Sequence, residues 1–221
     1  MSVPFDYSPY QGGAPVAPVT LQGRFVRLEP LALGHAPALV AAANADPAER
    51  YPYTFVPRTL AEAEAWIGLA LTAQGAGAHL PFATVDAQSG AVVGSTRFGN
   101  IERWSWQDGV QRRPAGNPDV AEIGWTWLAR AAQRSPINTE AKLLMLGHAF
   151  EQWKVFRMTL KTDARNQRSR DAIARLGARL DGVLRAWQPA SDGGPRDTAI
   201  FSLLAAEWPA VKARLQARLA Q

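Results

Sequence analysis

The sequence predicts an α/β (α+β) fold, in which helices flank a mixed, mostly antiparallel sheet of six to seven strands with a central parallel pair. Two observations predict it. Three strand-like segments follow one another without a helix between them, which favours antiparallel pairing. A strand–helix–strand unit comes next and is typical of a parallel pair. The junction of strand and helix beside such a pair is where open sheets of this class tend to bind ligands.

The composition is that of an ordinary globular protein. Its 221 residues, 47% of them hydrophobic, suffice for one domain with a sizeable core, with or without appendages. The lack of cysteine excludes a disulfide scaffold, a thiolate nucleophile and a cysteine-ligated metal, and three separated histidines leave little for a histidine metal centre. We therefore expect no metal. No apolar run approaches the roughly 20 residues that span a bilayer, and the first residues lack signal-peptide features, so we expect a cytoplasmic protein with no membrane partner.

A basic surface predicts a negatively charged partner. The formal net charge is +5 and the sequence pI is about 10.0. Nucleic acid, a membrane face and a phosphate-bearing small molecule would all be attracted to such a surface. No long block of one charge sign marks a nucleic-acid tail, so nucleic acid is the least favoured of the functions considered. The alternative is a solvated basic face without a partner.

The first elements are an arm, a strand and two helices. Residues 1–18 hold four prolines and no periodicity, which predicts an extended N-terminal arm. Residues 21–28 alternate apolar and polar side chains, as a strand does. Residues 35–43 are rich in alanine, and residues 60–73 repeat apolar side chains at helical spacing, so both segments predict helices.

The middle of the chain predicts three strands. Residues 81–86 and 91–101, separated by a turn at residues 88–90, are typical of an antiparallel hairpin. Residues 104–118 are polar, contain glycine and proline and carry two tryptophans. They are either a substrate-facing flap or a surface insertion. Residues 119–128 predict the next strand.

Two helices and three strands follow before the last helix. Residues 136–153 carry the widest apolar stripe, which suits a helix buried against a sheet. A strand over 155–162 follows, then a helix over 165–176 that ends at Gly177 in a left-handed cap. The remaining elements are strands at 179–184 and 198–204, around a Gly/Pro loop at 188–195, and a helix at 207–219. The predicted division is an arm (1–18), one domain (19–205) and a terminal amphipathic helix (206–221) packed on it.

Two junctions between a strand and a helix carry candidate binding groups. The helix that starts at residue 136 exposes unpaired N–H groups and a partial positive charge, to which Arg130 and Arg134 add full charges. In the second junction, Asn166 is a natural N-cap and Ser169 shares the inward face with Ile173. The alternatives are a helix end that binds only water, a purely capping Asn166 and a structural Ser169.

Several segments resemble a known family. They are Glu-Ile-Gly-Trp-Thr-Trp-Leu at 122–128, Ile-Asn-Thr-Glu-Ala-Lys-Leu-Leu at 137–144, Lys-Thr-Asp at 161–163, Asn166, Ser-Arg at 169–170 and Leu-Gly-Ala-Arg at 176–179. Together they resemble the GNAT superfamily of acyl-CoA-dependent N-acyltransferases, in particular its branch of ribosomal-protein N-terminal acetyltransferases (RimJ/RimL-like). The resemblance covers about residues 19–205. It implies a GNAT-like sheet and direct transfer of an acetyl group from acetyl-CoA to a primary amine, either a protein N-terminus or a small amine.

The resemblance also implies the residues that bind acetyl-CoA. Amides of the strand at 123–128 pair with the pantetheine arm, the loop at 133–138 cradles the pyrophosphate, and Asn166 hydrogen-bonds the pantetheine region. The implied cofactor-binding residues are Ile123, Trp125, Trp127, Leu128, Gln133, Arg134, Ser135, Ile137, Asn138, Thr139, Asn166 and Arg170.

The pyrophosphate loop departs from the family pattern, Gln/Arg-x-x-Gly-x-Gly/Ala. Gln133 fits, but Pro136 replaces the glycine and Asn138 the final small residue. Proline has no N–H, so one donor is missing, at a cost of about 1–3 kcal/mol of pyrophosphate binding. Arg134 could compensate with its charge. The departure motivates an alternative function, a catalytically weakened GNAT-fold binding or regulatory protein.

The same resemblance implies two catalytic residues. Glu122 stands where several members carry the carboxylate that deprotonates the amine, and Ser169 where this branch carries a proton donor for the departing thiolate. Many relatives use a tyrosine one turn later, where this chain has Ile173. Glu102 is the reserve base, and the alternative for Glu122 is a structural pairing with an arginine. Exposed tryptophans (Trp104, Trp106 and Trp187) either line the acceptor pocket or mark a homodimer contact.

Overall fold

The computed structural model describes residues 10–11, 16–104, 106 and 116–221. In this part of the chain, nine strands form one sheet in the order β2-β3-β4-β5-β6-β7-β9-β8, with β1 paired to β5. Strands β6 and β7 run parallel, and the other described pairs are antiparallel. The predicted mixed sheet with a central parallel pair is therefore confirmed. The strands are β1 (Tyr10–Gln11), β2 (Leu21–Gln22), β3 (Val26–Pro30), β4 (Leu80–Asp86), β5 (Val92–Arg103), β6 (Val120–Leu128), β7 (Arg157–Asp163), β8 (Arg179–Pro189) and β9 (Pro195–Leu204).

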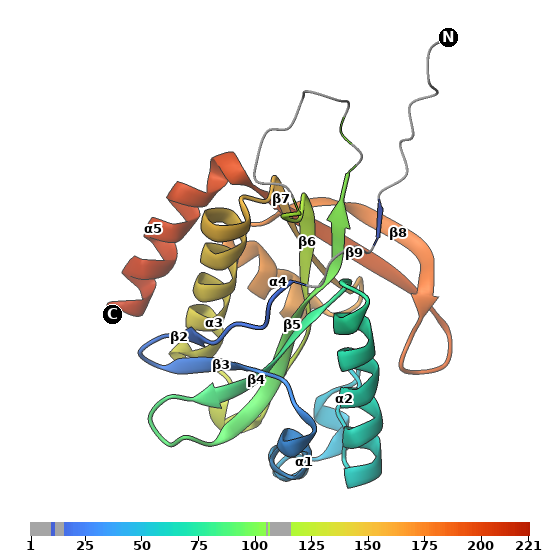
Figure 1. Ribbon diagram of the computed structural model, residues 1–221. Coiled ribbons are helices and arrows are strands. Elements are labelled where there is room, and N and C mark those ends of the chain that lie inside the picture. The colour runs from blue at the N-terminus through green and yellow to red at the C-terminus, as the bar shows by residue number, and fades with distance from the viewer. Residues whose placement is uncertain (1–9, 12–15, 105, 107–115) are drawn as a thin grey trace.

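Helices cover both faces of the sheet (Figure 1). Helices α1 and α2 pack on one face, and α3 and α5 pack on the other. The helices are α1 (Ala36–Asn44), α2 (Leu60–Gly75), α3 (Pro136–Gly147), α4 (Gln167–Leu176) and α5 (Trp208–Leu219). A π-helical segment, His148–Trp153, continues α3, so the helix predicted over residues 136–153 is present.

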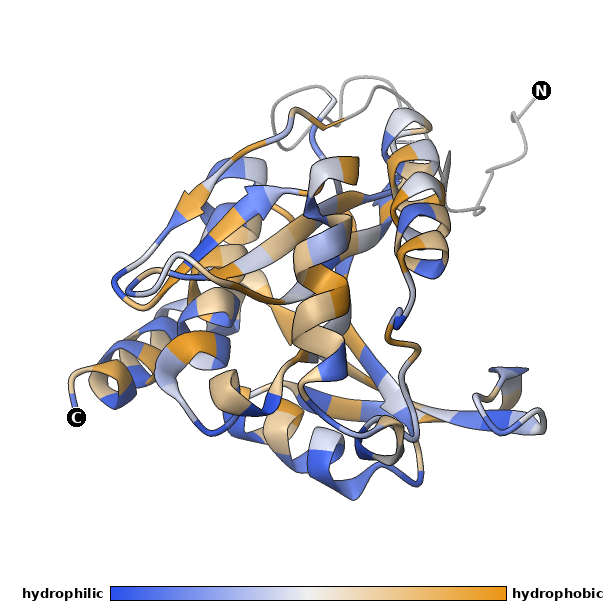
Figure 2. Cartoon of the chain, turned by 90° about the horizontal axis from the view of Figure 1, so that it is seen from below, coloured by the Kyte–Doolittle hydropathy of each residue, from blue (hydrophilic) through white to orange (hydrophobic). Residues whose placement is uncertain are grey.

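Each face of the sheet has its own apolar core. The larger core joins the sheet to α3, α4 and α5 and includes Phe82, Phe98 and Met145. The smaller core lies under α1 and α2 and includes Leu39 and Ile67. Figure 2 shows apolar residues along the strands and on helix sides that face them, with polar residues toward the outside. This arrangement is what the wide helical stripes predict.

Two short strands raise the count above the predicted six to seven. One is β1, within the predicted arm, where Tyr10 pairs with Arg103 of β5. The other arises because the strand predicted over residues 21–28 is in fact a hairpin, in which Leu21 of β2 pairs with Leu28 of β3. That prediction was wrong because alternation of side chains continues through both strands and hides the turn between them.

A carboxylate from α3 holds that hairpin turn. Glu140 is buried and accepts hydrogen bonds from the main-chain N–H groups of Arg24, Phe25 and Val26, at 2.9, 2.6 and 2.9 Å. Gly23 lies so close that a β-carbon there would overlap with this carboxylate. The turn is thus fixed by a residue distant in sequence.

Helix α4 ends where the sequence predicts, and strand β8 is longer than predicted. Gly177 ends α4 with φ of 101°, the left-handed cap that the sequence predicts. Strand β8 continues past residue 184 because pairing with β9 resumes at Gln188↔Arg196 after an irregularity. The loop predicted over 188–195 is correspondingly shorter. Most of the predicted flap at 104–118 lies outside the described residues.

The central parallel pair is short and opens the sheet. Strands β6 and β7 are in register only from Val120↔Arg157 to Glu122↔Thr159. Beyond Glu122 they separate, although β6 runs on to Leu128 and β7 to Asp163. One edge of each strand therefore has no partner strand where the two diverge.

A bulge in β6 lies at the point of separation. Gly124 pairs with Arg97 and Trp127 pairs with Ser95, so β6 carries one residue more than β5 between these pairs. Trp125 lies in the bulge with φ of 50°, a left-handed conformation that is strained for a tryptophan. Strain of this kind persists only where the surrounding structure holds it.

Candidate active site

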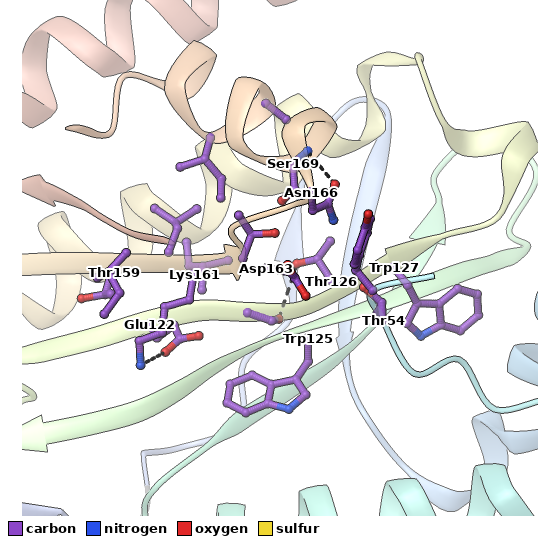
Figure 3. Close-up of a pocket in the computed structure, with 18 of the residues that line it drawn as sticks. Thr54, Glu122, Trp125, Thr126, Trp127, Thr159, Lys161, Asp163, Asn166 and Ser169 are labelled. Carbon is purple, nitrogen blue, oxygen red and sulfur yellow. Dashed lines mark hydrogen bonds and ion pairs between the residues drawn. The ribbon is translucent and has the colours of Figure 1, made fainter. Parts of the chain in front are cut away.

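A cleft of about 1920 Å³ lies where β6 and β7 separate. Its walls come from both strands and from the first turns of α3 and α4 (Figure 3). Most residues that the sequence singles out line it: Glu102, Glu122, Ile123, Trp125, Trp127, Leu128, Gln133, Arg134, Ser135, Asn138, Thr139, Asn166 and Ser169. The fold thus brings the two candidate junctions together in one cavity.

Two predicted cofactor-binding side chains do not line the cleft. Ile137 is buried in the larger core, and Arg170 donates from Nη1 to the carbonyl oxygen of Ala164 at 3.1 Å. Trp187 does line the cleft, whereas Trp104 and Trp106 pack on the ring of Phe156. Contacts of Ile137 and Arg170 with a coenzyme stay predictions.

Glu122 is held on the wall of the cleft by two partners. Only 7% of the residue is exposed. Lys161 Nζ lies 2.8 Å from Glu122 Oε2 (Figure 3). Asn100 Nδ2 donates to the same oxygen at 2.6 Å. Neither partner is the arginine that the structural alternative invoked. Within the described residues, Glu122 Oε1 has no hydrogen-bond partner, and it faces the space beside Gly124, where a β-carbon would lie 2.9 Å from it.

The second junction presents a hydroxyl to the cleft. The side chain of Asn166 caps α4 by accepting a hydrogen bond from Ser169 N at 3.1 Å, as Figure 3 shows. This cap fixes the first turn of α4, so that Ser169 lines the cleft opposite β6. In the described part of the chain its hydroxyl makes no hydrogen bond.

The loop between β6 and α3 gathers positive charge. Gln133 Nε2 donates to the carbonyl oxygen of Leu128 at 2.7 Å, and Gln133 Oε1 accepts from Arg50 and Arg168, each at 3.1 Å. Both arginines line the cleft together with Arg134, whose φ is 59°. Three cations from different parts of the chain therefore surround the end of β6.

The start of α3 leaves its proline away from the cleft. Ser135 caps the helix by accepting from Ile137 N at 3.3 Å, and Pro136 occupies the first helical position, as predicted. Ser135, Asn138 and Thr139 line the cleft, but Pro136 is not among the lining residues. The proline removes a donor without narrowing the cavity.

A lysine lies at the floor of the cleft. Lys142 of α3 is 5% exposed, and its Nζ donates to Thr126 Oγ1 at 2.8 Å and to Thr96 Oγ1 at 3.3 Å. Burial lowers the pKa of Lys142 to about 7, because the charged form loses its hydration.

A second buried cation lies on the other face of the sheet. The Arg97 guanidinium lies 4.6 Å from the ring centre of Trp66 and 5.1 Å from that of Trp125. Its Nη1 is 3.5 Å from His79 Nδ1, and desolvation lowers the pKa of Arg97 to about 10 and, with the charge of Arg97, that of His79 to about 4. The stack holds the strained Trp125 in the bulge beside the cleft.

The residues that sequence reasoning missed come from other elements. Asn100 and Arg50 lie in segments without a recognisable motif, and only the fold shows that they reach Glu122 and Gln133. Lys142 could have been found, because it follows Asn138 by four residues and so shares its helix face. The sequence signal for such a residue is a charged side chain on the face of an apolar helix that is expected to point into the protein.

Comparisons with known proteins agree with this geometry. Residues 26–179 match the acetyltransferase (GNAT) domain family. A GCN5-related N-acetyltransferase from Brucella melitensis superimposes with a TM-score of 0.78 and 32% identity, over 95% of this chain and 89% of that one. The chain belongs to the GNAT acetyltransferase family. It is thus an acyltransferase of the acetyl-CoA-dependent class, and the recognition of this family from the sequence is confirmed.

Other solved structures share the fold. A T. thermophilus protein assigned to the acetyltransferases matches with a TM-score of 0.74 and 35% identity, over 92% of this chain and 98% of that one. Mycobacterium smegmatis RimJ, in complex with CoA-disulfide, matches with a TM-score of 0.76 and 23% identity, over 93% and 97%. A sequence search of the curated proteins found no significant match.

Two features are absent from the described residues: a helix that could cross a membrane and a cluster of metal-ligating side chains. None of the helices in this part of the chain is both long and apolar enough to cross a membrane. The same residues contain no group of three or more histidine, aspartate or glutamate side chains that could hold a metal ion.

Proposed function

We propose that this GNAT protein is an N-acetyltransferase that moves an acetyl group from acetyl-CoA to a primary amine by direct attack. The observation that supports it most is the separation of β6 and β7, since one cleft then has Glu122 on one wall and Ser169 on another. Bound acetyl-CoA supplies the acyl group as a thioester. The residues around the cleft bind it, orient it and move protons.

The cleft suits an extended coenzyme with a charged end. The unpartnered edge of β6 over residues 123–128 offers main-chain groups to the amide-rich arm of the coenzyme. At the far end, the N–H groups at the start of α3 and the cations Arg50, Arg134 and Arg168 favour a diphosphate. These charges offset the donor lost at Pro136. A main-chain N–H in the bulge of β6 would stabilise the oxyanion as the amine attacks.

Glu122 is proposed to take the proton from the attacking amine, directly or through water. Lys161 and Asn100 both bind Oε2, which fixes the side chain and leaves Oε1 to accept the proton. Gly124 keeps the space next to Oε1 open. Glu102, which also lines the cleft, stays the reserve base.

Ser169 is proposed to return a proton to the departing thiolate. Its hydroxyl is held at the cleft wall by the Asn166 cap and is not engaged elsewhere in the described chain. The resemblance of the sequence to the ribosomal-protein N-terminal acetyltransferases supports a protein N-terminus as acceptor, and a small amine is the other candidate. A second copy of this chain as partner stays a prediction.

The test is a thiol-release assay with acetyl-CoA and a panel of peptide N-termini and small amines. We expect Glu122→Gln and Ser169→Ala each to lower kcat/KM by ~10²-fold or more on the best acceptor. Glu64→Gln, on the exposed side of α2, is the matched control and should leave it unchanged. Gly124→Ala, which crowds Oε1, should resemble Glu122→Gln.

Two results would contradict parts of the proposal. Unchanged turnover in both Glu122→Gln and Ser169→Ala would refute the assigned roles. If wild-type protein binds acetyl-CoA but releases no thiol with any amine, the alternative holds: a weakened GNAT-fold binding or regulatory protein, for which the missing N–H of Pro136 is the favouring observation.

A further inference from the structure

Lys142 occupies an unusual position for a lysine. It projects from α3 into the sheet, is 5% exposed and lines the cleft at the bulge of β6. Its two hydrogen-bond partners are hydroxyls, Thr126 Oγ1 in the bulge and Thr96 Oγ1 on β5. The two hydroxyls also lie 2.8 Å from each other. Each threonine therefore helps to hold the other in position as a partner of the Lys142 amine.

No carboxylate compensates this amine within the described residues. Buried lysines are rare unless paired, since desolvation penalises the ammonium form. Several charged and titratable groups on the elements packed around it are engaged elsewhere. Glu140 of α3 binds the β2–β3 turn, Glu122 of β6 pairs with Lys161 of β7, and Asp163 of β7 pairs with Arg165. Glu102 of β5 accepts from Trp104 Nε1, Arg97 of β5 stacks on the opposite face, and His148 after α3 stacks on Trp153. Arg157 of β7 is a further cation that lines the cleft.

One donor position of Lys142 is left over. An ammonium group carries three N–H donors, and the two threonines use two of them. The remaining one has no acceptor in the described chain, although the side chain borders a cavity. Because burial lowers the pKa of Lys142 to about 7, a new acceptor or a nearby anion would change its charge at neutral pH.

We propose that Lys142 is a coenzyme-binding residue: it donates its third hydrogen bond to a carbonyl oxygen of the acyl-pantetheine arm and takes up a proton as the coenzyme enters. This inference rests on the proposed function, since it requires an acyl-CoA in the cleft. A carbonyl oxygen can only accept a hydrogen bond. With two N–H donors bound to the threonines, the amine has a third donor to offer only in its ammonium form, and the coenzyme phosphates lower the cost of charging it. Binding therefore draws a proton from solvent and is tighter at pH 6 than at pH 8.

The test is isothermal titration of the intact protein with acetyl-CoA at pH 7.5, in phosphate and in Tris. The difference in heat between buffers of different ionisation enthalpy gives the protons taken up. For the wild type we expect about 0.7 proton more per coenzyme than for Lys142→Met, which should also bind about 10-fold more weakly. Proton exchange by the coenzyme phosphates is common to all variants and cancels in the difference.

Two further variants separate charge from packing. Lys142→Arg stays charged at all these pH values, so it should bind the coenzyme without the extra proton. Lys212→Met, which removes a partly exposed lysine paired with Glu151, is the matched control and should keep wild-type proton uptake. Should Lys142→Met fail to fold, a ¹³C-lysine NMR titration of the wild type replaces it, with the Lys142 signal expected to titrate higher when coenzyme is bound.

Each outcome decides the proposal. Equal proton uptake in wild type and Lys142→Met, or an NMR titration unmoved by coenzyme, overturns it while leaving acetyl-CoA binding intact. Failure of the wild type to bind acetyl-CoA at all overturns the proposed function as well. A purely structural lysine would alter affinity through misfolding but would not alter the proton count.

Discussion

Two buried charges two residues apart on α3 differ in how completely they are partnered. Glu140 is 7% exposed and accepts three main-chain hydrogen bonds from the β2–β3 turn. Lys142 is 5% exposed and has only two threonine hydroxyls. The difference teaches that burial alone does not give a charged residue its role. A fully partnered charge holds the fold, and an incompletely partnered one at a cleft wall can bind a ligand.

The largest expected effect is on stability, from Glu140→Ala. It leaves three main-chain donors without an acceptor, so we expect the free energy of unfolding to fall by ~3–5 kcal/mol. Urea denaturation followed by circular dichroism measures it. Glu64→Ala, which removes an exposed carboxylate on α2, should cost less than about 0.5 kcal/mol. A loss at Glu140 no larger than at Glu64 would end the contrast with Lys142.

A double-mutant cycle sharpens the role of Glu140. In Gly23→Ala the new methyl group overlaps with the Glu140 carboxylate, and we expect a loss of ~2 kcal/mol. In the Glu140→Ala background the same change should cost under about 0.5 kcal/mol, because the obstacle is gone. Additive losses would mean that the carboxylate does not approach Gly23 in solution.

The expected effect that is most specific to Lys142 is a pH dependence. Its pKa is about 7 in the folded protein and near the ordinary 10.5 when unfolded. Between these values the unfolded chain binds more protons, so wild-type stability should rise with pH through this window, by up to ~1.4 kcal/mol per pH unit. Lys142→Met lacks this rise, so its advantage over wild type should be greatest at pH 6 and shrink toward pH 9.

Urea denaturation of both proteins at pH 6, 7.5 and 9 measures this dependence. A difference in unfolding free energy that stays constant over the range would show that Lys142 keeps its proton in the folded state. Lys212→Met serves as the control for the replacement of a lysine by methionine away from the cleft.

The sequence predicts local structure well where the residues of the segment itself determine its conformation. The cap at Gly177, the proline at the first position of α3 and the strand–helix–strand unit were predicted from neighbouring residues alone. The hairpin at residues 21–28 was not, because its turn depends on Glu140, far along the chain. Local periodicity contains no information about such a partner.

The residues of the candidate site likewise fall into two groups, those that the sequence predicts and those that only the fold reveals. Glu122, Asn166 and Ser169 follow from the family resemblance, and all three line the cleft. The partners that give them their chemistry do not follow from it. Lys161 lies in a strand and pairs with Glu122 only because β6 and β7 are parallel and in register up to that point.

The central claim, that the opening between β6 and β7 holds acetyl-CoA, is tested most directly by a crystal structure of the protein grown with the coenzyme. The pantetheine arm should run along residues 123–128, with a carbonyl oxygen within hydrogen-bond distance of Lys142 Nζ and the diphosphate among the N–H groups at the start of α3. A coenzyme bound elsewhere, or a cleft closed at Pro136 under saturating coenzyme, would contradict the account.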